Sequence, residues 1–286
     1  MTTPSSTPTG LRERVLAASR SARSAGRPTP TPPEITAMDA FARAADAFNG
    51  LLSALSATQW HTPVLRELDV QGLVGHLTGV ERDVQRALRG DVDVADADHV
   101  ASTQDLAEAQ TGREPQTTQA EWRAAADRTL ADVEASDRDR GDVLSMHGMR
   151  LSLDALLVVR AFELWTHEND IRRVVGMPSS VPDPSTLTLM TDLAVQLLPH
   201  AVTRTSALSS ATDLHLVLTG DGGGTWDLPL GAKDAADVAS DLLLVVDAVD
   251  FCRLVANRVA PETIDVHVEG AGANGVLSAA ASLALD

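Results

Sequence analysis

The chain has 286 residues and a formal charge of −17 at pH 7, which argues against a phosphate backbone as its partner. Its 44% hydrophobic content is ample for one or two buried cores, and no apolar run reaches the length of a membrane span. One cysteine excludes an internal disulfide and a thiolate metal cluster. Because the N-terminus also lacks an apolar signal segment, we expect a cytoplasmic protein without nucleic-acid or membrane partners.

Residues 1–33 are predicted to form a flexible leader. Residues 1–10 are polar, and residues 11–25 carry several charges that favour a short basic helix. Residues 26–33 read Gly-Arg-Pro-Thr-Pro-Thr-Pro-Pro, a composition that excludes a helix and favours an extended linker.

The next segments are predicted to be helices, because their apolar residues recur at steps of three and four. We predict helices over about 33–55, 69–90, 119–135, 153–175 and 185–198, with 91–117 acidic and irregular and 138–150 a connector. Asp69 is a suitable N-cap for the second of these helices. Four helices with heptad-like apolar faces predict an antiparallel bundle over 34–200, and such bundles build metal sites from facing helices.

The pattern changes from residue 213 onward, where apolar and polar residues alternate as they do in strands. Strands are predicted over 214–219, 225–230, 242–246 and 264–268, and helices over 248–256 and 276–285. We therefore expect a small α+β domain over 212–286, with the boundary near 200–212. The glycine-rich run 220–224 is interpreted as a hairpin turn, because a strand follows it and not the helix that a phosphate loop requires.

Glu163 and His167 lie four residues apart in the longest predicted helix and therefore share one face of it. Their neighbours are apolar, so both side chains need partners. A divalent metal satisfies both, and a Glu–His hydrogen-bonded pair is the alternative. Asp170 and Glu168 are candidates to orient the imidazole of a ligand from outside the coordination sphere.

His76 is the histidine that best complements this pair, because its predicted helix must share the bundle core. His76, Glu163 and His167 would form a three-ligand set with an open position, as in catalytic zinc sites. His61, His99 and His200 lie in loop contexts, and His215 and His267 are expected on a solvated strand face. His147, just before the longest predicted helix, is interpreted as a loop residue, with a place in the lining of a cavity as the alternative. Cys252 lies among apolar helix residues and is expected to be a buried structural cysteine.

Two segments resemble the mycothiol-dependent maleylpyruvate isomerase family, a branch of the DinB-like metalloproteins. Leu73-Val-Gly-His76-Leu-Thr-Gly-Val-Glu81 is similar to the family's first histidine segment. Arg160-Ala-Phe-Glu163-Leu-Trp-Thr-His167-Glu-Asn-Asp170-Ile-Arg172 resembles its second signature, R-x-x-E-x-W-x-H-x-x-D-I-R. The resemblance covers about residues 36–178, and the C-terminal part is similar, less specifically, to a sterol-carrier-like domain.

The resemblance implies that His76, Glu163 and His167 bind a divalent metal, usually zinc, and that mycothiol is the thiol cosubstrate. It implies thiol S-transfer to a small electrophilic substrate, or cis–trans isomerisation as with maleylpyruvate. Arg258, at the end of a predicted C-terminal helix, is a candidate to hold an anionic substrate, with an exposed helix-end arginine as the alternative. We expect a monomer or homodimer.

Two other functions fit the same residues. An iron(II) oxygenase also uses two histidines and one carboxylate, and a noncatalytic regulator or small-ligand binder can retain a metal-binding bundle.

Overall fold

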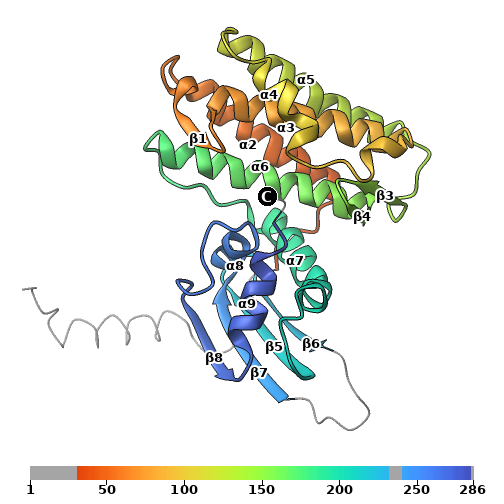
Figure 1. Cartoon of the computed structure of the whole chain (residues 1–286), viewed down its shortest axis with the longest axis vertical. Helices are drawn as coiled ribbons and strands as arrows, with labels where there is room; N and C mark the ends of the chain where they lie inside the picture. The colour runs from red at the N-terminus through yellow and green to blue at the C-terminus, as the bar shows by residue number, and fades with distance from the viewer. Residues whose placement is uncertain (1–30, 232–239, 285–286) are drawn as a thin grey trace, which may run out of the picture. The chain divides into compact units, whose positions relative to one another are not determined.

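The computed structural model describes residues 31–231 and 240–284 (Figure 1). Nearly all of the predicted leader, including its basic helix, lies outside the described residues. Within the described ranges, no helix is long and apolar enough to cross a membrane.

Four long helices form the predicted bundle, which confirms this part of the fold. They are α2 (Ala37–Ala54), α3 (Val70–Leu88), α5 (Pro115–Glu134) and α6 (Leu153–Val174). Asp69 caps α3 as predicted, because its carboxylate accepts from the backbone N–H of Gly72. The apolar faces meet in one core, in which Phe48 packs edge-on against Trp122. Each fully buried large apolar side chain contributes roughly 1.5–3 kcal/mol.

The prediction of an irregular 91–117 segment was wrong in part, because η2 (Val92–Val94) and helix α4 (Ala101–Glu108) lie within it. Helix α4 packs against α3 at two glycines on the face of α3 that carries His76. A Cβ atom on Gly75 would lie 2.6 Å from the carbonyl oxygen of Leu106, and one on Gly79 would lie 2.9 Å from Cβ of Thr103. These two glycines therefore allow the close approach of the two helices.

Two short hairpins flank the bundle helices. Following η1 (Gln59–His61), strands β1 (Pro63–Leu65) and β2 (Leu68–Asp69) precede α3, and β3 (Val143–Met146) and β4 (Met149–Ser152) precede α6. The predicted connector over 138–150 thus contains an antiparallel hairpin, whose turn holds His147. Its backbone is tied to the segment after η2, because the N–H groups of His147 and Gly148 donate to the carbonyls of Val94 and Ala95.

A four-stranded sheet with strand order β6-β5-β7-β8 forms the predicted C-terminal α+β region. The strands are β5 (Thr212–Thr219), β6 (Gly224–Leu230), β7 (Ser240–Asp247) and β8 (Val266–Gly270), with β5 and β7 parallel and the other pairs antiparallel. Helices α8 (Ala248–Val255) and α9 (Ala273–Ala281) complete the region (Figure 1). The glycine-rich run is the β5–β6 turn, as predicted.

Helix α7 (Pro184–Thr205) links the two regions and is longer than predicted. Its first half, with Leu187 and Met190, belongs to the bundle core. Its second half, with Leu198 and Val202, belongs to a separate apolar core beneath the sheet. Both cores therefore share this helix.

Candidate metal centre

Side chains from three segments form one close group in the bundle: His76 from α3, His99 from just before α4, and Glu163 from α6. His167, one turn further along α6, lies beside this group, with its Nε2 3.9 Å from Oε1 of Glu163. The ring of His76 is fixed by Thr103, whose hydroxyl lies 2.6 Å from Nδ1. The Thr103 hydroxyl is also within bonding distance of the backbone carbonyls of His99 and Val100. Because that hydroxyl donates its one proton to a carbonyl, its oxygen accepts from Nδ1–H of His76. The lone pair of His76 then lies on Nε2, which faces Glu163.

Glu163 is oriented by Arg160, one turn earlier on α6. The guanidinium of Arg160 donates to Oε2 of Glu163 and, through Nε and NH2, to Oε1 of Glu81 at 3.1 and 2.8 Å. The other oxygen of Glu81 accepts from Thr129 at 2.8 Å. Arg160 and Glu81 are fully buried. Two carboxylates thus share the guanidinium of Arg160.

His167 is held by Asp170 in the next turn of α6, as the sequence predicts. Oδ2 of Asp170 lies 3.2 Å from Nδ1 of His167. Arg258 donates to the same carboxylate through Nε and NH2, each at 2.9 Å, while its NH1 donates to the carbonyl of Ala256. Because a carboxylate accepts protons only, Nδ1 of His167 is the donor and Nε2 carries the lone pair.

His99 is held by His147, which is held in turn by Asp83. The two Nδ1 atoms lie 3.0 Å apart, and Nε2 of His147 lies 3.0 Å from Oδ2 of Asp83. Asp83 accepts the Nε2–H of His147, so the Nδ1 of a neutral His147 accepts the Nδ1–H of His99. The lone pair of His99 is then also on Nε2. His147 is therefore a buried partner and not an ordinary loop histidine, which corrects the interpretation from sequence.

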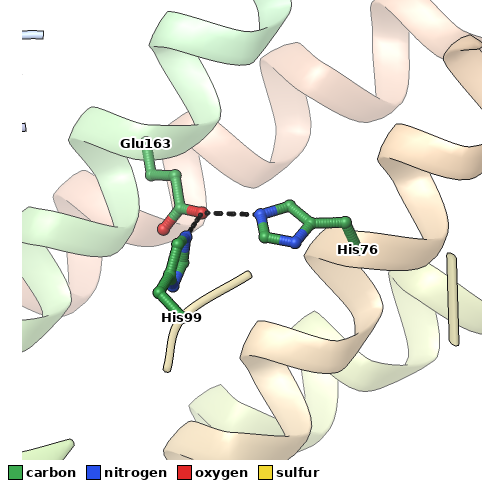
Figure 2. A group of neighbouring side chains, drawn as sticks. All are labelled: His76, His99 and Glu163. Carbon is green, nitrogen blue, oxygen red and sulfur yellow. Dashed lines mark ion pairs between the residues drawn. The ribbon is translucent and has the colours of Figure 1, made fainter. Parts of the chain in front are cut away.

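The three Nε2 atoms lie around a single oxygen, Oε1 of Glu163. Figure 2 shows this oxygen between the rings of His76 and His99. The distances to Oε1 are 3.6 Å from His76, 3.5 Å from His99 and 3.9 Å from His167. These separations are too long for hydrogen bonds, which disfavours the simple Glu–His pair considered from the sequence. Nε2 of His76 and Oε1 of Glu163 are both buried without a hydrogen-bond partner.

The arrangement fits a divalent metal ion. Lone pairs and a carboxylate oxygen that face one another without a proton are costly to bury. A cation between them would satisfy the two unpartnered atoms, Nε2 of His76 and Oε1 of Glu163. Nitrogen and oxygen donors of this kind suit zinc and other first-row metals.

Burial keeps the imidazoles neutral, as metal ligation requires. It lowers the pKa of His76 to about 2 and that of His99 to about 4, with the charge of Arg160 acting in the same direction on both. Burial also lowers the pKa of His167, against the opposing effect of Asp170. For Asp170, burial alone would raise the pKa, but hydrogen bonds from His167 and Arg258 outweigh it and hold the pKa at about 2.

The sequence-predicted residues occupy different places relative to this centre. His76, Glu163 and His167 come together, whereas Arg258 contacts Asp170 and is part of its support. Glu168 accepts from Arg172 at 2.7 Å and does not contact an imidazole. Sequence reasoning missed His99 and favoured a loop role for His147. The two glycines beside His76, Gly75 and Gly79, are the signal that could have indicated a closely packed neighbour. Cys252 is fully buried, as predicted, and burial raises the pKa of its thiol.

A cleft of about 420 Å³ lies on the opposite side of α6 and is separate from the centre. It is lined by residues of α2, the 177–186 segment and the face of α6 that carries Trp165 and Arg172. None of the four converging residues lines it, so the chemistry of the centre gives no role to this cleft.

The fold and the buried cluster define a helical-bundle protein with an internal site of metal-ligand type, followed by a small α+β region. Residues 41–172 match the family model described as the mycothiol maleylpyruvate isomerase N-terminal domain. The family relationship that the sequence motifs predicted is thereby confirmed for this part of the chain.

Other proteins and solved structures resemble this chain along most of its length. Two uncharacterised proteins of Mycobacterium tuberculosis, from strains CDC 1551 and H37Rv, are each 25% identical over 246 residues, covering 84% of this chain and 91% of theirs. The crystal structure of the mycothiol-dependent maleylpyruvate isomerase aligns with a TM-score of 0.55 at 10% identity, covering 82% of this chain and 91% of that one. A histidine-to-alanine mutant of that enzyme aligns with the same TM-score at 9% identity. At such low identity the structural matches establish the fold alone.

Proposed function

We propose that this protein is a metal- and mycothiol-dependent enzyme that activates a thiol for attack on a small electrophilic substrate, by S-transfer or cis–trans isomerisation. Its metal ligands include His76, Glu163 and His167. The observation that carries the proposal is the buried group of imidazole Nε2 atoms around Oε1 of Glu163. The cytoplasmic location predicted from the sequence remains part of the proposal.

A divalent metal, with zinc as the first candidate, would supply the positive charge that favours the thiolate form of a bound thiol at neutral pH. The chain's own residues prepare this site. Thr103, Asp170 and His147 each hold an Nδ1 atom, so that three Nε2 lone pairs point inward. Arg160 holds Oε2 of Glu163 and leaves Oε1 directed to the same point.

The thiol chemistry follows from this arrangement. The thiolate sulfur forms a bond to an electrophilic carbon of the substrate, and the electron pair of the substrate's double bond moves onto the adjoining activated group. In isomerisation, the resulting single bond rotates. The electron pair then returns from the activated group to re-form the double bond, as the carbon–sulfur bond breaks and the thiolate leaves with its own electron pair. In S-transfer, the adduct takes up a proton and leaves as the product.

The charge balance favours a neutral thiol cosubstrate. The chain carries −17 overall, so an anionic molecule is repelled unless local positive charge compensates. The sugar-linked thiol mycothiol meets a smaller barrier. The negative charges of its thiolate and of Glu163 would together balance the two positive charges of a divalent metal ion.

The test measures thiol-dependent turnover and metal content in Glu163→Gln, with Glu168→Gln as its matched control. Both substitutions remove a carboxylate from α6, but Glu168 pairs with Arg172 outside the centre. We expect Glu163→Gln to lose turnover with mycothiol and a panel of electrophiles, whereas Glu168→Gln retains it. Wild-type turnover in Glu163→Gln, or no spectral change when mycothiol is added to cobalt-substituted wild-type protein, would contradict the proposal.

A further inference from the structure

We propose that His99 supplies a fourth protein ligand, so that three imidazoles and one carboxylate hold the metal. This inference rests on the metal centre of the proposed function and extends it beyond the His76, Glu163 and His167 set. The starting observation is that a nitrogen of His99, a nitrogen of His76 and an oxygen of Glu163 all lie within 4.8 Å of one another (Figure 2).

The position of His99 matches that of the other two histidines. Its Nε2 lies 3.5 Å from Oε1 of Glu163, compared with 3.6 Å for His76 and 3.9 Å for His167. Its ring is T-shaped against that of His76, with the centroids 5.0 Å apart. The side chain is nearly fully buried, so its nitrogen faces the centre and not solvent.

The support of His99 is as complete as that of the other histidines. Nδ1 is bonded to His147, which is anchored by Asp83, and Asp83 is itself paired with Arg86 at 3.1 Å. A carboxylate behind a histidine is the usual way to fix the tautomer of a metal-bound imidazole. Here a second histidine stands between the carboxylate and the ligand.

One threonine also couples two of the histidines. The hydroxyl of Thr103 accepts from the ring of His76, and it lies 3.1 Å from the backbone carbonyl of His99. The position of the His99 backbone is therefore tied to the ring of His76.

The competing arrangement is a hydrogen bond from His99 to Glu163. It requires a proton on Nε2 of His99, which leaves Nδ1 as an acceptor. His147 then has to donate from both nitrogens, to His99 and to Asp83, and becomes a buried cation. In that arrangement His99 donates a hydrogen bond to Glu163 and does not bind the metal. The side-chain amide of a glutamine at position 99 can donate the same hydrogen bond.

Four protein donors change how a thiol enters the centre. A tetrahedral zinc held by four protein ligands has no vacant position, whereas three ligands leave one open. A thiol therefore has to add as a fifth ligand or replace one of the four.

The experiment compares cobalt- and zinc-loaded wild-type protein with His99→Gln, using His61→Gln as the matched control. His61 is exposed and belongs to η1, away from the cluster. Metal affinity is measured by competition with a chelator, and the coordination of cobalt by its visible absorption. We expect His99→Gln to shift the absorption and to lower the affinity more than 10-fold, with His61→Gln unchanged.

An unchanged cobalt spectrum in His99→Gln overturns the inference, whatever happens to the affinity, because His99 then acts from outside the coordination sphere. A measurement on the wild-type protein avoids any folding defect in the variant. X-ray absorption of the zinc-loaded protein should show three imidazole ligands on zinc, and a count of two imidazoles would overturn the inference. His76→Ala distinguishes the failures, because wild-type affinity in that variant would sink the metal centre of the proposed function itself.

Discussion

Single residues decide the chemistry of the centre by bonding the outward-facing ring nitrogen, Nδ1, of each histidine. Thr103, His147 and Asp170 each bond an Nδ1 atom, and together they leave three Nε2 atoms free to bind a cation. The His167–Asp170 pair was predictable, because residues three apart in a helix share a face. The His99–His147 pair was not, because 48 residues separate the two and their contact depends on how two loops pack.

The role of Arg258 can be tested at this scale. Its Nε and NH2 bind the carboxylate that holds His167, so we expect Arg258→Ala to weaken metal binding by about 10–100-fold. Arg258→Lys should rescue this loss poorly, because lysine cannot form the bidentate contact. Metal affinity is measured by chelator competition. The control is Arg253→Ala, which removes the half-buried ion pair between Arg253 and Asp250 on α8.

The anionic-substrate role considered for Arg258 from the sequence has a different signature. In that case Arg258→Ala raises KM for an anionic electrophile and leaves metal affinity unchanged, and lysine restores most of the loss because it keeps the charge. Measuring KM and metal affinity in the same two variants separates the roles.

At the scale of elements, the long amphipathic helices and the alternating strands were predictable, because each carries its own periodicity. Helix α4 was not. Its eight residues have no strong apolar stripe, and its N-cap residue, Val100, has no side chain that can accept from the helix N-terminus. A helix this short owes its stability to tertiary packing, here against Gly75 and Gly79 of α3. The missed helix and the missed ligand His99 therefore have one cause.

Gly75→Ala tests this packing. A methyl group at this position would lie 2.6 Å from the backbone oxygen of Leu106 and 2.9 Å from Cα of Ala107, so α4 has to move. We expect a loss of about 1–3 kcal/mol in the free energy of unfolding from overpacking, and weaker metal binding as Thr103 and His99 shift. Denaturant unfolding and chelator competition measure the two effects.

Gly50→Ala is the matched control on helix α2. Nothing lies within 4 Å of a Cβ atom added there, so alanine should stabilise the protein by roughly 0.5–1 kcal/mol through helix propensity alone. Equal changes in the free energy of unfolding for Gly75→Ala and Gly50→Ala would show that the packing of α4 does not require a residue without a side chain at position 75.

At the scale of the whole molecule, the change from helical to alternating periodicity correctly predicted an α+β region after the bundle. The sequence did not show that α7 contributes to both cores. A helix with apolar residues on several faces does not indicate which elements pack against each face. Leu187 and Met190 pack with the bundle, while Leu198 and Val202 pack beneath the sheet. Arg258 adds a second link, from the end of α8 to Asp170 of the bundle.

The predicted two-domain organisation, with its boundary at 200–212, remains to be tested by limited proteolysis. Helix α7 ends at Thr205 and β5 begins at Thr212, so the exposed backbone near Ser206, Ser209 and Ser210 is the expected cleavage site. Because α7 contributes apolar residues to the core beneath the sheet, separating the fragments would expose that core. We therefore expect a cut in this interval, identified by mass, with both fragments eluting together on a sizing column. Absence of any cut between about 178 and 215 would count against the boundary, and a sheet fragment that elutes alone and folded would show that its core does not need α7.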